Sequence, residues 1–239
     1  MKTSNLQALI FDVDGTLAET ERDGHRIAFN TAFADFGLTW HWDVGLYGKL
    51  LSITGGKERI RHFVAHDLPP SEHPKSLDSL VVALHAAKTA HYLRLLENGK
   101  IALRPGIARL LNEARAAGLR LAIATTTTPE NVSALLSLCL GQESLGWFEA
   151  IGAGDIVPHK KPAPDIYEWV LKTLNLPAEA CLAFEDSANG LRSARAAGIP
   201  TWVTTNAYTA HEDFSGALSV THTLENVRLD DLLKKFSNI

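Results

Sequence analysis

One stretch near the start of the chain decides the fold: Leu6-Gln7-Ala8-Leu9-Ile10-Phe11-Asp12-Val13-Asp14-Gly15-Thr16. Its apolar part, Leu6–Phe11, has the length of a buried strand and is followed directly by acidic residues. Residues two apart on a strand project from the same face, so the carboxylates of Asp12 and Asp14 are predicted to meet at the end of this strand. Gly15 allows the chain to turn sharply and to approach a ligand closely. An ordinary acidic turn is the alternative interpretation.

Further apolar runs of strand length follow, and segments with helical periodicity lie between them. The apolar runs are Leu119–Ala124, Ala150–Gly152, Cys181–Phe184 and Thr201–Thr204. The amphipathic segments are Ile107–Ala117, Pro164–Leu174 and Ala188–Ala197. Nearly continuous apolar strands that alternate with helices indicate a parallel sheet covered on both faces. The predicted fold class is therefore α/β, with a Rossmann-like, doubly wound parallel sheet as the core.

The segment 18–99 differs from the rest because it lacks clear strand runs. Its periodicity predicts helices over His25–Phe36, Lys57–His66 and Leu77–Glu97. A crossover between parallel strands seldom needs more than one helix, so a helical module inserted after the first strand is the economical explanation. We predict a helical cap domain over 18–99 and a discontinuous core domain formed by 1–17 and 100–239.

Composition restricts the class of protein. The 239 residues are 46% hydrophobic and 21% charged, with a formal net charge of −4, which gives no electrostatic reason to expect nucleic-acid binding. No apolar stretch approaches the roughly 18 residues of a membrane span, and the first apolar run is too short and too quickly acidic for a signal peptide. We expect a cytoplasmic monomer (or a protein of the plastid stroma, if the chain is a processed form) with no nucleic-acid or membrane partner.

Two more polar segments follow predicted strands. The run Thr125–Thr128 offers hydroxyl and backbone N–H groups that can hold phosphate oxygens, although β-branched residues also suit a strand end for structural reasons. In Lys161-Pro162-Ala163-Pro164-Asp165, the first proline biases Lys161 toward an extended conformation, and the second suits the first turn of a helix. Lys160 competes with Lys161 for an inward position, and a solvated lysine pair is the alternative.

A third pair, Glu185-Asp186, ends the apolar run that begins at Cys181, and two acids at such a place need water or a cation. The order Asp-x-Asp-Gly-Thr, hydrophobic-Thr, Lys-Pro, Glu-Asp resembles the four motifs of the haloacid-dehalogenase superfamily. The segments 161–165 and Phe184-Glu185-Asp186-Ser187 are similar to its β-phosphoglucomutase-like and CbbY-like branch. This resemblance covers essentially the whole chain.

The resemblance implies a catalytic cycle with an aspartyl-phosphate intermediate. Asp12 attacks phosphorus in line, while Asp14 protonates the departing alcohol oxygen and later takes a proton from water. Lys161 and Thr125 stabilise the charge of the transferring phosphoryl group. Many members of the superfamily have Asn where this chain has Thr126, so the hydrogen bonding around Asp12 stays open. Thr126 and Thr127 are predicted to bind substrate.

Several acids gathered at one edge of a sheet repel one another and require a cation. Oxygen ligands and phosphate suit Mg²⁺. We predict Mg²⁺ bound by the Asp12 carboxylate, the Asp14 backbone carbonyl and the Asp186 carboxylate, with Glu185 contributing directly or through water. Lys161 supplies the remaining positive charge.

The cap contributes a second group of candidate residues: Thr54, Gly55, Gly56 and Lys57. The glycines allow close backbone approach, and Lys57 lies near a predicted helix N-terminus, where anions are favoured. This segment is predicted to hold a phosphate that is not transferred. A glycine turn with an exposed lysine is the alternative. Glu19, at the hinge, is predicted to bind a substrate hydroxyl, or else is a surface acid.

The runs Thr54–Ile60, Thr125–Thr128 and Tyr208–Phe214 are similar to CbbY-type phosphatases. That resemblance implies a small phosphorylated sugar as substrate, specifically xylulose-1,5-bisphosphate, a misfire product that inhibits Rubisco, hydrolysed to xylulose 5-phosphate. A phosphomutase that returns the phosphoryl group to the sugar, and a noncatalytic sugar-phosphate-binding regulator, are the competing hypotheses.

Overall fold

The computed structural model describes residues 5–238, so residues 1–4 and 239 of the predicted core domain lie outside the described residues. The chain forms two compact units. Of the described residues, 5–19 and 102–238 form one unit, and Thr20–Ile101 form the other.

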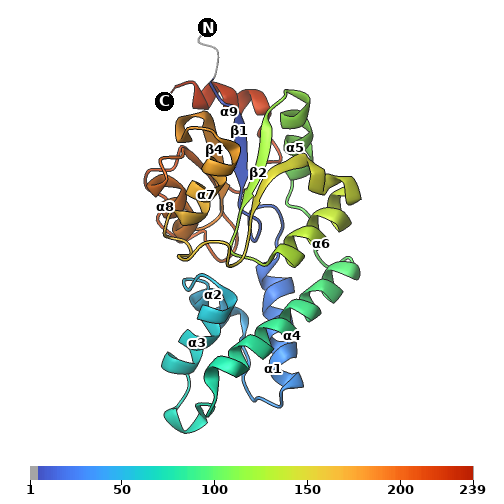
Figure 1. Ribbon diagram of the computed structural model, residues 1–239, viewed down its shortest axis with the longest axis vertical. Helices are drawn as coiled ribbons and strands as arrows, with labels where there is room; N and C mark the ends of the chain where they lie inside the picture. Colours follow the sequence, from blue (N-terminus) through green and yellow to red (C-terminus); the bar gives the residue numbers. More distant parts are fainter. Residues whose placement is uncertain (1–4, 239) are drawn as a thin grey trace. The chain divides into compact units, whose positions relative to one another are not determined.

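The first unit is built on a parallel sheet (Figure 1) with the strand order β3-β2-β1-β4-β5-β6. The strands are β1 (Ala8–Phe11), β2 (Arg120–Ala124), β3 (Phe148–Gly152), β4 (Cys181–Glu185), β5 (Thr201–Thr204) and β6 (Ser219–Thr221). All five predicted strands are present. The sixth, β6, has only one strongly apolar residue, Val220, which is half exposed, so its sequence carried no strand signal.

Helices cover both faces of this sheet, so the predicted doubly wound α/β class is confirmed. They are α5 (Ile107–Ala116), α6 (Pro129–Leu140), α7 (Asp165–Leu174), α8 (Ala188–Ala196) and α9 (Leu229–Phe236), with short 3₁₀ turns η3 (Gln142–Trp147) and η4 (Ala178–Ala180). Helices α7 and α8 pack on one face, whereas α5 lies on the other and contacts α9.

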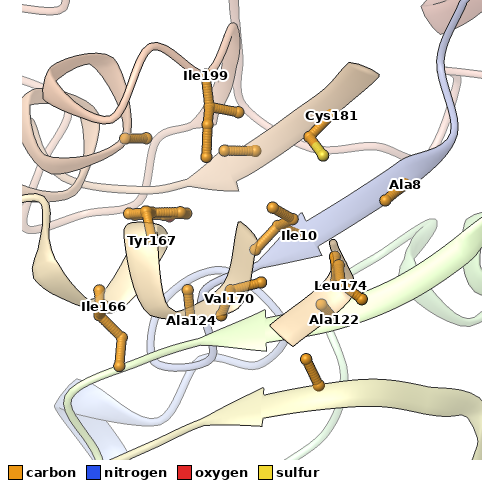
Figure 2. Packing of buried hydrophobic residues seen from close by; sticks show 13 residues of the cluster. Ala8, Ile10, Ala122, Ala124, Ile166, Tyr167, Val170, Leu174, Cys181 and Ile199 are labelled. Atoms are coloured by element: carbon orange, nitrogen blue, oxygen red, sulfur yellow. The ribbon is translucent and has the colours of Figure 1, made fainter. Parts of the chain in front are cut away.

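Alternate strand residues form the core beneath α7 and α8 (Figure 2). Ile10 of β1, Ala122 of β2 and Cys181 of β4 face Val170 and Leu174 of α7, and all five are buried. The intervening strand residues are equally buried on the opposite face. Burial on both faces explains why the strands read as continuous apolar runs instead of alternating with polar residues.

The register of β1 sets the position of the residues that follow the strands. Phe11 lies opposite Ile123 of β2 and opposite Phe184 of β4, so these three strands reach the same edge of the sheet together. From β1 the chain continues to β2 and β3 on one side of the sheet, and then to β4, β5 and β6 on the other, so the strand order reverses between β1 and β4. Ligands of open α/β sheets bind at such a topological switch point, at the edge where the strands end.

The second unit is helical, as predicted. It contains η1 (Glu21–His25), a π-helical turn, followed by α1 (Arg26–Asp35), α2 (Val44–Leu50), α3 (Gly56–His66), the 3₁₀ turn η2 (Pro70–Glu72) and α4 (Leu77–Glu97). Its core is aromatic: the ring of Trp42 lies 4.7 Å from Phe29, 4.9 Å from Phe33 and 5.5 Å from Phe63, measured between centroids. Among residues 5–238, no helix has the length and apolar character needed to cross a membrane.

Candidate active site

Asp12 directly follows β1 and continues its hydrogen-bond ladder, because its backbone N–H donates to the Phe184 carbonyl at 3.0 Å. The strand itself ends at Phe11. A tight turn follows, in which the backbone N–H groups of Thr16, Leu17 and Ala18 donate to the Val13 carbonyl and Gly15 has φ +80°. Strand alternation does not extend to Asp14, because the strand ends before it. The end of the strand places Asp12 and the turn places Asp14, and the two acids are close enough for the charge of Asp14 to raise the pKa of Asp12.

Lys161 is the lysine that reaches Asp12. Its Nζ donates to Asp12 Oδ1 at 2.7 Å, to Glu185 Oε1 at 2.6 Å and to the Ala124 carbonyl at 2.8 Å. Lys160 instead forms an ion pair with Asp155 at 2.8 Å. The sequence left these two lysines as competitors, and the structure assigns the buried position to Lys161, whose peptide bond to Pro162 is cis.

Burial sets the direction of the pKa shift of Asp12, but not that of Lys161. Removal from water raises the pKa of Asp12 to about 7, with the Lys161 ammonium opposing and the Glu185 carboxylate adding to the rise. Burial alone would lower the pKa of Lys161, but the carboxylates of Asp12 and Glu185 outweigh it, so the pKa of Lys161 is raised and its ammonium stays charged. A further positive charge at this edge would favour the ionised form of Asp12.

Tyr167, on α7, belongs to the site although the sequence analysis did not single it out. Its hydroxyl donates to Glu185 Oε1 at 2.5 Å. Burial and the neighbouring Glu185 raise the pKa of Tyr167, which keeps it protonated as a donor. The other Glu185 oxygen lies against the backbone of α8, where a Cβ at Gly190 would come within 1.9 Å of Oε2. Helical periodicity marks Tyr167 as buried but cannot reveal the partner of its hydroxyl.

Three buried carboxylates could hold a cation: those of Asp12, Glu185 and Asp186, which each offer an oxygen within 4.8 Å of the others. Among these acids and Lys161, negative charges outnumber the positive one. Oxygen donors with excess negative charge fit a hard divalent cation such as Mg²⁺. The residues of this edge therefore suit the predicted metal.

The residues of the run Thr125–Thr128 differ in their contacts. Thr125 is buried; its N–H donates to the Gly152 carbonyl at 2.9 Å, and its Oγ1 accepts from the Thr127 N–H at 3.3 Å. The Thr127 hydroxyl accepts from Asn131 Nδ2 at 3.1 Å, and Thr128 caps α6. Thr125 lies beside Ala124, whose carbonyl holds Lys161, whereas Thr128 is structural. Thr126 is half-buried in the same turn.

Arg104 is a buried residue that the sequence did not single out. Its guanidinium donates to the carbonyls of Gly15, Thr204, Thr205 and His222. Its Nε also pairs with Glu19 Oε1 at 3.0 Å. Arg104 therefore ties the turn after β1 to the end of β5. Glu19, predicted to bind a substrate hydroxyl, has this ion pair as well, and half of its side chain is exposed.

In the second unit, the predicted phosphate-binding segment begins α3. Gly55 is the N-terminal cap at φ +96°, a conformation that favours glycine. A Cβ at Gly56 would lie 2.9 Å from the ring of His85. Both glycines thus have a structural reason for being there, and Thr54 and Lys57 beside them are half-buried. Lys57 lies in the first turn of α3.

A sequence profile of the haloacid dehalogenase-like hydrolases matches residues 6–198. The chain belongs to this family. Protein CbbY from a plasmid of Cupriavidus necator is 54% identical over 215 residues, which cover 90% of this chain and 84% of that protein. The family and the enzyme class predicted from the sequence, a phosphatase, are thereby confirmed.

Solved structures of a CbbY protein agree with this assignment. The crystal structure of CbbY from Rhodobacter sphaeroides in complex with phosphate is similar with a TM-score of 0.88 and 46% identity, covering 95% of this chain and 99% of that one. A mutant of that protein in complex with xylulose-1,5-bisphosphate gives a TM-score of 0.87 at the same identity and coverage. The phosphatase thus has the fold of the CbbY proteins over nearly its whole length.

Proposed function

We propose that the chain is a Mg²⁺-dependent sugar phosphatase that hydrolyses xylulose-1,5-bisphosphate to xylulose 5-phosphate through an aspartyl-phosphate. The observation that carries the reaction class is the contact of the Lys161 ammonium with Asp12, 2.7 Å away, at the switch point of the sheet. The sugar is proposed from the likeness to a CbbY protein crystallised with xylulose-1,5-bisphosphate.

In this proposal, Asp12 is the nucleophile, and Lys161 fixes its orientation by occupying Oδ1 and leaving Oδ2 to attack phosphorus. Lys161 and the Thr125 hydroxyl balance the charge of the transferring group, which is where phosphoryl transfer gains most. Asp14 donates a proton to the departing alcohol and then accepts one from the attacking water. Thr126 and Thr127 contact the phosphoryl oxygens, and Glu19 accepts from a substrate hydroxyl.

The metal is assigned to the Asp12 carboxylate, the Asp14 backbone carbonyl and the Asp186 carboxylate. When bound, Mg²⁺ would neutralise the charge that a phosphate dianion brings to an already acidic edge. Glu185 Oε1 accepts from both Lys161 and Tyr167, so we propose that Glu185 orients the Lys161 ammonium. Its contribution to cation binding would be through water.

Metal removal and a substrate screen test this function. We expect phosphate release from xylulose-1,5-bisphosphate to stop with EDTA, to return with excess Mg²⁺ and to exceed release from xylulose 5-phosphate. A colorimetric phosphate assay and chromatography of the sugar products measure both. An isomerised sugar phosphate without free phosphate would indicate a phosphomutase, and tight binding without turnover would indicate a regulator; either result contradicts the proposal.

A second prediction concerns the phosphate that is not transferred, which we assign to Thr54, Gly55, Gly56 and Lys57. Replacing Lys57 by alanine removes a charge-assisted hydrogen bond, so we expect KM for the bisphosphate to rise about tenfold or more. KM for a sugar monophosphate should change little. Lys49→Ala, in α2, is the control for loss of a cap cation. Equal effects of Lys57→Ala on both substrates would refute the assignment.

A further inference from the structure

Asn206 lies in the loop after β5 and is buried, with hydrogen bonds from both ends of its amide. Its Oδ1 accepts from the backbone N–H groups of Tyr208 at 2.8 Å and of Thr209 at 3.2 Å. This is the local turn that asparagine favours. Because Oδ1 faces two backbone donors, the orientation of the amide is fixed, and Nδ2 must point to the opposite side.

On that side, Nδ2 of Asn206 donates to Asp186 Oδ2 at 2.7 Å. The backbone of Gly15 closes over this hydrogen bond, since a Cβ there would come within 2.2 Å of Asp186 Oδ2 and 2.8 Å of Asn206 Nδ2. The carboxylate of Asp186 is therefore held between an amide donor and the turn that carries Asp12 and Asp14.

We propose that Asn206 is a positioning residue that holds the Asp186 carboxylate ready for a divalent cation, an inference that rests on the proposed metal-dependent function. A ligand that is held in place before the cation arrives binds it more tightly than one that must reorient. The donor Nδ2 is then needed for cation affinity, whereas the acceptor Oδ1 is needed only for the turn.

The isosteric variant Asn206→Asp separates these two duties. It keeps an oxygen to accept from Tyr208 and Thr209, so the turn is retained, but it replaces the donor facing Asp186 by a second carboxylate. Repulsion between two carboxylates this close displaces the Asp186 carboxylate from its present position, and the loss of this ordered ligand outweighs the attraction of the added charge. We expect the Kd for Mn²⁺, measured by electron paramagnetic resonance at pH 8 without substrate, to rise about 10- to 100-fold. The Mg²⁺ concentration for half-maximal phosphate release should rise in parallel.

Two further variants complete the design. Gln142→Glu adds the same charge at an exposed position in η3 and should leave the Kd unchanged. Asn206→Ser keeps a weaker turn acceptor without added charge, and we expect a smaller rise; it also serves if Asn206→Asp does not fold, as judged by circular dichroism.

If Asn206→Asp bound Mn²⁺ with the affinity of the wild type, the positioning role would be overturned, because a residue that only forms the turn would leave cation binding unchanged. If only Asn206→Ser folds, the same test applies to that variant. A wild-type enzyme that neither binds Mn²⁺ nor releases phosphate would instead overturn the proposed function itself. The two failures are therefore distinguishable.

Discussion

Replacing Asp12 by asparagine is expected to lower the rate of phosphate release by about 10⁴-fold or more, because the variant lacks the oxygen nucleophile on which the covalent route depends. The fold should persist. Acid-quenched wild-type enzyme should carry a phosphoryl group on Asp12, and the variant should carry none, as measured by intact-protein and peptide mass spectrometry. A trapped phosphoenzyme in Asp12→Asn would remove Asp12 from the role of nucleophile.

The stability of this variant separates a catalytic loss from a folding defect. Burial raises the pKa of Asp12 to about 7, well above the value of 3.8 for the unfolded chain, so ionising Asp12 costs the metal-free folded state free energy. This group therefore lowers the stability of the metal-free protein progressively as pH rises from about 4 through 7. We expect the free energy of unfolding of metal-free Asp12→Asn at pH 8 to match or exceed that of wild type, measured by urea denaturation.

The parts of the fold that follow from the sequence are those with strong periodicity or a buried apolar run. The helix Leu77–Glu97 was predicted with the bounds it has, and Thr201–Thr204 likewise, because each combines a clear pattern with turn residues at its ends. Helices α2, α6 and α9 and strand β6 escaped prediction. Helices α6 and α9 are long enough and were missed, whereas helix α2 and strand β6, with seven and three residues, carry too little periodicity to be told from a loop. Tertiary contacts decide such short elements.

The candidate site divides in the same way. Asp12 and Glu185 could be placed together because each follows or ends an apolar run, and parallel strands reach one edge. Lys161 lies beyond the end of β3 and was placed by its Lys-Pro motif. The partners of these residues could not: Tyr167 looks like any buried aromatic residue on a helix, and Asn206 looks like any turn asparagine. Their roles depend on where a hydroxyl or an amide points, which is set by contacts between segments far apart in the sequence.

Lys161→Met is the second substitution expected to have a large effect, because the buried ammonium contacts two buried carboxylates and one carbonyl. Methionine has a similar length and no charge. Without the ammonium of Lys161, the carboxylates of Asp12 and Glu185 lie buried without a positive charge beside them. Breaking a buried ion pair costs about 3–5 kcal/mol. We expect that loss in the free energy of unfolding of the metal-free enzyme at pH 8, with phosphate release slowed about 10²- to 10³-fold.

The control is Lys160→Met, since the Asp155 carboxylate that pairs with Lys160 is largely exposed. Partly exposed pairs contribute about 1 kcal/mol or less, so this variant should keep most of its stability and activity. Adding Asp12→Asn to Lys161→Met should recover part of the lost stability, because it removes one of the two buried carboxylates that have lost their positive partner. The double variant should recover no activity. Excess Mg²⁺ should narrow the stability deficit of the single variant, because a cation bound only by the folded state supplies positive charge in place of the ammonium. If Lys160→Met proved as damaging as Lys161→Met, the buried lysine would have no special role beside the nucleophile.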